Sequence, residues 1–346
     1  MKTKVLSIAA LAVTAALVAT AAALAGGSAR SDDALSGAGA TFPFPLISQW
    51  QKDYESKTGV KINYNPIGSG GGIAAITART VDFGASDAPL TPDQFTACKG
   101  CVQIPWVLSA TAVIYNLPGV PNNLKLTGPI IANIYLGNIT QWDADAIKKI
   151  NPGVNLPSTK ITPVWRSDGS GTTYNFTDYL SAVSPQAKSK IGNSTQVNWP
   201  VGVGGRGSSG LAGVVKNTTG GIGYVDIAYA LANKIQFARV LNRAGKYVTP
   251  GLRGIAAAGK QVTKVPPSNE MHIVNPTKGD PLAYPICTFS YVILPINSSK
   301  SAALRRFVFY ALTQGQKLGP KLLFVPIPKP VLVASEKTLK KVQAGT

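Results

Sequence analysis

The sequence has few of the residues that build metal sites and hydrolytic sites. Only one histidine, His272, and three cysteines occur among its 346 residues. A zinc site needs three or four ligands, drawn mostly from these two residue types, so it would use nearly all of them. A Ser-His-Asp hydrolase could take only His272 as its base. No metal site is therefore expected, and a hydrolytic activity would depend on a single residue.

Acidic side chains are scarce as well. The chain has 15 Asp and Glu against 34 Lys and Arg, a formal net charge of +19. Because the basic residues are scattered and form nothing longer than pairs such as Arg305-Arg306, the charge does not indicate a nucleic-acid interface. Two explanations stay open: the charge steers an anion to its binding site, or it reflects an acidic medium in which paired carboxylates would lose their charge.

Nucleotide-binding motifs are absent or weak. The chain has no Gly-x-x-x-x-Gly-Lys-Ser/Thr, the phosphate-binding loop of many nucleotide triphosphatases. Residues 202–207 satisfy Gly-x-Gly-x-x-Gly, and Asp226 follows at about the distance of a ribose-binding acid. This segment lies in mid-chain, however, whereas a dinucleotide fingerprint opens the first strand-helix unit. We expect neither a nucleotide nor any other cofactor.

The N-terminus has the pattern of a signal peptide. Lys2 and Lys4 precede an apolar run over 5–24, and Ala23-Leu-Ala25 matches a cleavage signal. A transmembrane anchor is the competing interpretation, but the alanine content and the cleavage signal favour removal of 1–25. Loss of the two lysines takes the formal charge from +19 to +17. The mature protein is predicted to be periplasmic or extracellular.

The cysteines allow one disulfide. In an oxidising compartment Cys98 and Cys101 can form a bridge across the two residues between them. Such a pair could be a redox dithiol or a small structural staple. The staple is favoured because nothing nearby resembles the strand-to-helix setting of a thioredoxin motif. Cys287 is expected to be a small buried apolar residue.

Apolar periodicity alternates between strand and helix along the rest of the chain, which predicts an α/β protein with largely parallel sheets. Apolar stripes at helical spacing within 46–54 and 304–312 are expected to be core faces. A short last helix is expected over 335–342, after a proline-rich segment that wraps the surface. The expected strands are 60–64, 102–115, 161–165, 222–225, 236–241 and 290–294.

Three loops rich in glycine and hydroxyl side chains share one chemistry. They occupy 37–42, 68–72 and 167–173, each before a predicted helix. A helix N-terminus presents unpaired N–H groups and the positive end of the helix dipole, and glycine lets an anion approach the backbone closely. Arg166, just before the third loop, could offer a guanidinium fork to an oxyanion. One such loop would be an ordinary helix cap, but three loops with an arginine predict a phosphate or sulfate site.

A carboxylate near such a site suggests selectivity. Asp87 could simply be a turn residue before Pro92. Beside an anion, however, an ionised aspartate can accept a hydrogen bond from protonated phosphate, whereas fully ionised sulfate has no proton to donate. A buried polar group that the wrong ligand leaves unpaired can lower its binding by a factor of about 10⁴. Asp87 is therefore predicted to discriminate phosphate from sulfate.

Four segments carry a resemblance to a known family. They are Gly37-Ala-Gly-Ala-Thr-Phe-Pro43, Ile67-Gly-Ser-Gly-Gly-Gly72, Val81-Asp-Phe-Gly-Ala-Ser-Asp-Ala-Pro-Leu90 and Arg166-Ser-Asp-Gly-Ser-Gly-Thr172. Together they resemble the periplasmic phosphate-binding proteins of the bacterial high-affinity phosphate ABC importers. The resemblance covers most of 35–295 in order and is weak beyond Leu294. The chain departs from the commoner pattern at Gly70, where family members often have a second serine.

The resemblance implies a site and the residues that form it. Phosphate would lie dehydrated in a cleft and be held by hydrogen bonds from neutral donors and one arginine. Asp87 would accept the proton of the ligand, and Asp168 would orient the Arg166 guanidinium. No metal and no catalytic residue is implied. The implied phosphate contacts are Thr41, Phe42, Ser69, Asp87, Arg166, Ser170, Gly171 and Thr172.

The same resemblance implies a two-lobed periplasmic binding protein fold of type II, with the ligand cleft between the lobes and two hinge crossovers. Lobe one would hold 32–108 and 288–346, and lobe two 109–287. Hinge closure over phosphate would let a monomer deliver it to a membrane ABC permease without catalysis.

An alternative function is a secreted phosphate sensor or a phosphate-ester hydrolase of the same fold. The hydrolase would need His272 as its base. Because Asn269-Glu-Met-His272 offers no partner motif, we expect His272 to be a surface residue of a loop.

Overall fold

The structure is a computed structural model that describes residues 34–277 and 280–345. The expected signal peptide over 1–25 lies outside these ranges. Within them, no helix combines the length and apolar character that a membrane span requires.

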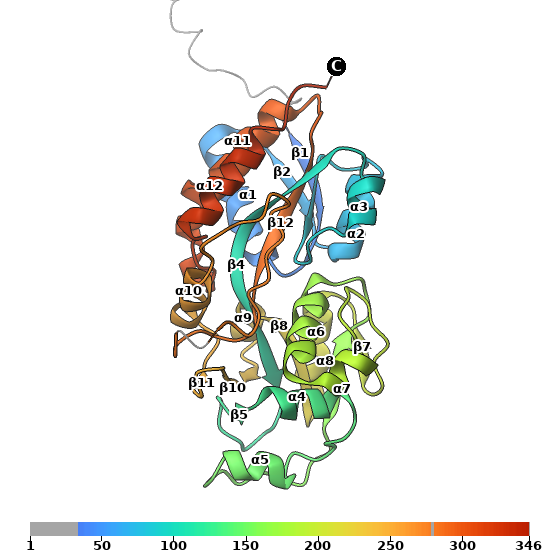
Figure 1. The fold of residues 1–346 in the computed structure, drawn as a ribbon, viewed down its shortest axis with the longest axis vertical. Helices are drawn as coiled ribbons and strands as arrows, with labels where there is room; N and C mark the ends of the chain where they lie inside the picture. Colours follow the sequence, from blue (N-terminus) through green and yellow to red (C-terminus); the bar gives the residue numbers. More distant parts are fainter. Residues whose placement is uncertain (1–33, 278–279, 346) are drawn as a thin grey trace, which may run out of the picture.

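A mixed sheet runs through the molecule (Figure 1). Its order is β2-β1-β3-β12-β4-β8-β6-β7, and β9 pairs with one end of β4. A second sheet has the order β11-β10-β5. The strands are β1 (Leu35–Gly39), β2 (Ile62–Asn65), β3 (Phe83–Ser86), β4 (Cys101–Tyr115), β5 (Lys125–Leu126), β6 (Thr162–Arg166), β7 (Val203–Gly205), β8 (Gly221–Asp226), β9 (Gln236–Phe237), β10 (Arg239–Leu241), β11 (Tyr247–Val248) and β12 (Cys287–Pro295).

Strand β4 belongs to both halves of the large sheet. Its residues 101–110 pair with β12, and its residues 111–115 pair with β8. The group β1, β2, β3 and β12 therefore lies toward one end of the long axis, and the group β6, β7 and β8 toward the other (Figure 1). Every residue of β4 is buried, which explains its continuous apolar run.

The expectation of largely parallel sheets is wrong at the centre of the molecule. The pairs β1–β2, β1–β3, β6–β7 and β6–β8 are parallel. Strand β12, however, is antiparallel to β3 and β4, and β4 is antiparallel to β8. The direction of a strand pair is not written in its apolar pattern, and here β12 returns alongside the strand that links the two groups.

Helices cover both groups of strands. In Figure 1, α1, α2, α11 and α12 surround the β1–β3 group, α4, α6, α7 and α8 lie around the β6–β8 group, and α5 lies at the far end of the molecule near β5. The helices are α1 (Phe44–Thr58), α2 (Ser69–Thr77), α3 (Pro92–Ala97), α4 (Gly128–Tyr135), α5 (Asp145–Ile150), α6 (Gly171–Val183), α7 (Pro185–Lys190), α8 (Gly207–Asn217), α9 (Ile227–Ala232), α10 (Leu252–Lys260), α11 (Ser301–Leu312) and α12 (Lys329–Leu339), with 3-10 helices η2 (Gln314–Leu318) and η3 (Pro320–Leu322).

The predicted strands and core faces are confirmed. The six expected strand regions overlap β2, β4, β6, β8, the pair β9 and β10, and β12, with most ends differing by one to three residues. The apolar stripes of α1 and α11 are buried, and Trp50 and Phe307 pack with Trp106 in one aromatic cluster. The last helix is longer than expected: α12 begins at Lys329, because Pro330 occupies its first turn, where the missing N–H has no helical partner.

Two strands that sequence patterns did not predict carry the candidate site. β1 has the sequence Leu-Ser-Gly-Ala-Gly, which lacks the bulky side chains typical of strands. The two glycines are needed because β3 lies close on one side: a Cβ atom on Gly37 would overlap the Phe83 ring, and one on Gly39 would overlap the Ala85 carbonyl. Helix α2 also approaches β1 closely, since a Cβ atom on Gly72 would overlap the Gly39 Cα atom. β3 is similarly short, with the sequence Phe-Gly-Ala-Ser, and all four of its residues are buried.

Candidate functional site

One face of the candidate site is built where β1 and β3 end. Thr41 and Phe42 follow β1, Ser69 is the first residue of α2, and Asp87 follows β3 directly. The carboxyl ends of neighbouring parallel strands are the usual location of ligand sites in α/β sheets. All four residues are buried. The glycine-rich second loop is thus the first turn of α2, and 37–39 of the first loop belong to β1.

The opposite face is built where β6 ends. Arg166 is the last residue of β6, and the loop that follows leads into α6. Ser170 caps α6, because its hydroxyl accepts a hydrogen bond from the Thr173 N–H at 3.2 Å. Tyr224 of β8 supports this loop: its hydroxyl accepts from the Arg166 N–H at 3.1 Å and bonds the Thr173 hydroxyl at 2.8 Å.

The two faces are in direct contact. The Ser69 Oγ accepts hydrogen bonds from the Asp87 N–H at 3.2 Å and from the Gly171 N–H at 3.0 Å. The Gly70 N–H donates to the Gly169 carbonyl at 2.9 Å. A Cβ atom on Gly171 would lie 2.6 Å from the Asp87 Cβ, so only glycine permits this approach. The two faces are therefore closed on each other in this structure.

Several donors at this contact have no partner among the described residues. The Phe42 N–H and the Thr172 N–H make no hydrogen bond within 34–277 and 280–345. Arg166 uses its Nε and Nη2 atoms on Asp168, and no bond from its Nη1 atom to the described chain is found. Buried N–H groups are nearly always paired in proteins. These donors therefore fit a small buried anion between the faces.

The Asp87 carboxylate also lies at this contact. The Ser290 hydroxyl donates to its Oδ1 at 2.8 Å, and the Thr172 hydroxyl lies 3.4 Å from its Oδ2. Burial raises the pKa of Asp87 to about 7, although Ser290, the Arg166 charge and Thr172 all favour the ionised form. A carboxyl that titrates near neutral pH can share a proton with phosphate.

Asp168 has the opposite behaviour. It binds the Arg166 guanidinium through both oxygens, at 2.7 and 2.5 Å, and accepts from the Gly207 N–H at 2.9 Å. Burial works against the ionised form, but the arginine and the N–H groups outweigh it, so the pKa of Asp168 is lowered. Arg166 is thus fixed in orientation, as the family resemblance implied.

The structure adds residues that sequence patterns missed. Ser208, at the start of α8, bonds the Thr41 hydroxyl at 2.7 Å, and the Tyr229 hydroxyl donates to the Thr41 carbonyl at 2.7 Å. Ser290 reaches Asp87 from the middle of β12. The glycine-rich segment before α8 was a signal for Ser208, whereas nothing in the sequence marked Tyr229 or Ser290.

The predicted site residues lie together. Thr41, Phe42, Ser69 and Asp87 form one face, and Arg166, Ser170, Gly171 and Thr172 form the other, with Asp168 behind Arg166. A cavity of about 290 Å³ adjoins this contact, and Thr41, Asp168 and Ser208 line it. The structure places these residues at one contact, and their role in phosphate binding remains a prediction.

The cysteines are arranged as predicted. Cys98 and Cys101 form a disulfide between the end of α3 and the start of β4. Cys287 is a free thiol buried in β12, and burial raises its pKa well above the ordinary value.

Comparison with known proteins identifies the class and then the family. Residues 25–314 match a family model described as "PBP superfamily domain". Over 299 residues the chain is 44% identical to the phosphate-binding protein PstS of Xylella fastidiosa, which covers 85% of this chain and 81% of that protein. The chain belongs to the family of PstS phosphate-binding proteins.

Solved structures show the same mixed α/β fold. A high-affinity periplasmic phosphate-binding protein, PfluDING, bound with phosphate has a TM-score of 0.71 at 21% identity, covering 88% of this chain and 93% of its own. The phosphate-binding protein of Stenotrophomonas maltophilia has a TM-score of 0.69 at 20% identity, with the same coverage.

Proposed function

We propose that this chain binds one inorganic phosphate ion between the two faces of the site and delivers it to a membrane ABC permease. The observation that carries the proposal is a set of donors from both faces that have no partner within 34–277 and 280–345, with the Asp87 carboxylate at the same contact. The Phe42 and Thr172 N–H groups and the free edge of Arg166 come from both faces. Membership of the PstS family and the names of its relatives support phosphate as the ion.

The site residues take the roles that the resemblance implied. Thr41, Phe42 and Ser69 donate from the first face, and Arg166, Ser170, Gly171 and Thr172 from the second. Asp87 accepts the remaining proton of phosphate, and Asp168 holds the guanidinium. Since phosphate and Asp87 together need only one shared proton, the pKa of Asp87 near 7 suits this role. Sulfate brings no proton and leaves two unshielded negative groups in contact.

Hinge closure explains how a buried ion can enter and leave. We propose that 32–108 and 288–346 form one lobe and 109–287 the other. The chain crosses between them within β4, where the pairing changes from β12 to β8 after residue 110. Opening would separate Ser69 from Gly171 and expose the site to water.

Delivery to a permease requires that the protein acts outside the cytoplasm. The predicted signal peptide over 1–25 and the Cys98–Cys101 disulfide support a periplasmic or extracellular location. The closed, loaded form would dock on the permease in preference to the open form, as a monomer.

The position of His272 does not support the hydrolase alternative, in which His272 would be the base. His272 bonds Asp178 and Glu270. Asp178 lies seven residues beyond Gly171 on α6, about 10 Å along the helix axis. His272 and Asp178 are therefore not placed to activate water at the anion loops.

Direct binding tests the proposal. Protein freed of ligand by partial unfolding and refolding should bind labelled phosphate with one-to-one stoichiometry in equilibrium dialysis. Small-angle scattering should show a decrease in the radius of gyration on addition of phosphate. A protein that binds no phosphate, or several ions, would contradict the proposed site.

A further inference from the structure

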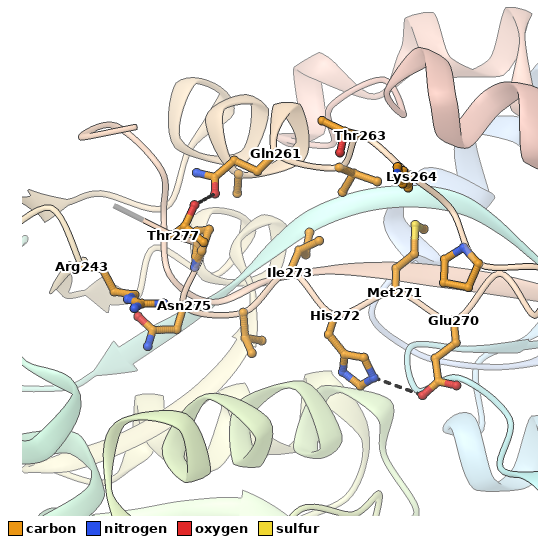
Figure 2. Close-up of a pocket in the computed structure, with 15 residues that line it drawn as sticks. Arg243, Gln261, Thr263, Lys264, Glu270, Met271, His272, Ile273, Asn275 and Thr277 are labelled. Atoms are coloured by element: carbon orange, nitrogen blue, oxygen red, sulfur yellow. Dashed lines mark hydrogen bonds and ion pairs between the residues drawn. The ribbon is translucent and has the colours of Figure 1, made fainter. Parts of the chain in front are cut away.

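His272 is held between two carboxylates outside the anion site. Its Nδ1 lies 3.4 Å from the Asp178 Oδ2, and its Nε2 lies 3.1 Å from the Glu270 Oε1. Figure 2 shows the bond to Glu270 at the edge of a cavity of about 560 Å³. The hydrogen bond to Asp178 and the one to Glu270 outweigh burial and raise the pKa of His272 to about 9. The expected surface residue is therefore a paired cation.

The segment that carries His272 is fixed to the β1–β3 group. The Asn269 side-chain amide donates to the Gln103 carbonyl of β4 at 2.8 Å and to the Thr338 hydroxyl of α12 at 2.9 Å. The Met271 N–H donates to the Tyr291 hydroxyl of β12 at 3.1 Å. Residues 268–272 fall inside the range proposed for lobe two. The bonds of Asn269 and Met271, however, are to strands and a helix of the other lobe.

Asp178 belongs to the opposite group. It lies on α6, which packs against α4, α7 and β8. The first turn of the same helix holds Gly171, whose N–H donates to Ser69, and Thr172, whose hydroxyl lies 3.4 Å from the Asp87 Oδ2. The Asp178–His272 pair therefore connects the helix that carries the third anion loop to a segment anchored on the other face.

We propose that His272 and Asp178 are positioning residues whose ion pair holds α6 in the closed arrangement and so slows the release of phosphate. This inference rests on the proposed function. When α6 moves away from Ser69 and Asp87, the pair must separate, because its partners are fixed to different groups of strands. A contact made only in the closed state shifts the equilibrium toward that state by its own free energy.

The pair is partly exposed, so its effect is modest. The side chains of His272 and Asp178 are 49% and 23% exposed. Exposed ion pairs contribute little, and loss of this one should speed phosphate release by about threefold. Glu270 provides a matched control because it contacts the same imidazole but lies two residues away on the same segment. Its bond does not connect the two faces.

The test is the phosphate dissociation rate measured by stopped flow in the full-length mature protein. His272→Gln and Asp178→Asn should each release phosphate about threefold faster, and the double variant should be no faster than either single variant. His272→Arg, which keeps the cation, should release phosphate at nearly the wild-type rate. Glu270→Gln should have a smaller effect than Asp178→Asn. In His272→Gln and Asp178→Asn, the unfolding midpoint should fall below that of the wild type by more when phosphate is bound than when it is absent.

Two results would overturn the inference while leaving the proposed function intact. The first is wild-type release rates in His272→Gln and Asp178→Asn. The second is equally fast release from His272→Arg and His272→Gln, which would show that the charge is not what matters. Failure of the wild-type protein to bind phosphate would instead refute the proposed function, and this inference with it.

Discussion

The two faces of the site use charge in opposite ways. The face after β1 and β3 offers backbone and hydroxyl donors and one carboxylate, Asp87, whose pKa is raised by burial. The face after β6 offers Arg166, whose charge is matched by Asp168, a carboxylate with a lowered pKa. The two aspartates differ because only Asp168 contacts the guanidinium directly. We therefore propose that the first face provides selectivity and the second provides attraction.

Removal of the arginine should have the largest effect. Arg166→Ala removes the buried guanidinium of the second face and leaves the half-buried Asp168 without its partner. We expect phosphate affinity to fall by at least about 3 kcal/mol, more than 100-fold, in calorimetric titration. Arg166→Lys should recover only part of this loss, because lysine cannot bind both Asp168 oxygens in the same way. Unchanged affinity in Arg166→Ala would refute the placement of the anion.

Closure of the two faces can be broken at one glycine. The Cβ of Gly171→Ala would lie 2.6 Å from the Ala88 nitrogen and from the Asp87 Cβ. The faces would then stay apart, and phosphate affinity should fall by about 2 kcal/mol, while the ligand-free protein should be nearly as stable as the wild type.

Gly213→Ala provides the control for this change. Gly213 also lies in a helix, α8, and a Cβ there would meet nothing within 4 Å. Its phosphate affinity should match that of the wild type. Equal losses in the two variants would show that close approach at Gly171 is not required.

Neutralising Asp87 should reveal the role of the first face. Asp87→Asn should weaken phosphate binding by only about 1 kcal/mol, but it should let sulfate bind. Competition between labelled phosphate and sulfate measures both effects. A variant that still ignores sulfate would show that another group excludes it.

Asp87 should also affect the stability of the ligand-free protein. Its pKa in the folded state, about 7, lies above the usual value of 3.8. Between these values the folded state binds more protons than the unfolded state, so stability should fall as pH rises from about 4 to 7. Asp87→Asn should lessen this fall in chemical unfolding followed across that range. An unchanged pH profile would contradict the pKa assigned to Asp87.

The smallest effect on phosphate affinity is expected from Asp168→Asn, because Asp168 lies behind Arg166 on the second face. Asp168→Asn keeps an oxygen for the Gly207 N–H but removes the charge that fixes Arg166. Phosphate affinity should fall by about 1 kcal/mol or less, because the guanidinium itself remains. A loss as large as that of Arg166→Ala would mean that Asp168 does more than orient the arginine.

Much of the site could be predicted from short segments of sequence, because each face is built from a strand end and the helix start that follows it. Any one of these loops could be an ordinary helix cap, but three of them together with an arginine indicate an anion site. Tyr229 and Ser290 could not be predicted, since each reaches the site from a distant element through tertiary packing. Asp178, one partner of His272, could not be predicted either, because it comes from the distant helix α6.

The fold was predictable to a similar degree. Long apolar runs such as β4 could be predicted as strands, whereas the glycine-rich β1 could not, because close packing against Phe83 and Ala85 of β3 excludes side chains at Gly37 and Gly39. The antiparallel centre of the sheet depends on the path of β12, which no local pattern records.

The most direct test of the account is calorimetric titration of the ligand-free protein with phosphate and with sulfate at pH 8 and at pH 5.5. At pH 8, where Asp87 is ionised, we predict one-to-one phosphate binding and no heat from sulfate. At pH 5.5 Asp87 is protonated and can donate to sulfate, so weak sulfate binding should appear. Equal binding of both anions at pH 8 would contradict the assignment of selectivity to Asp87.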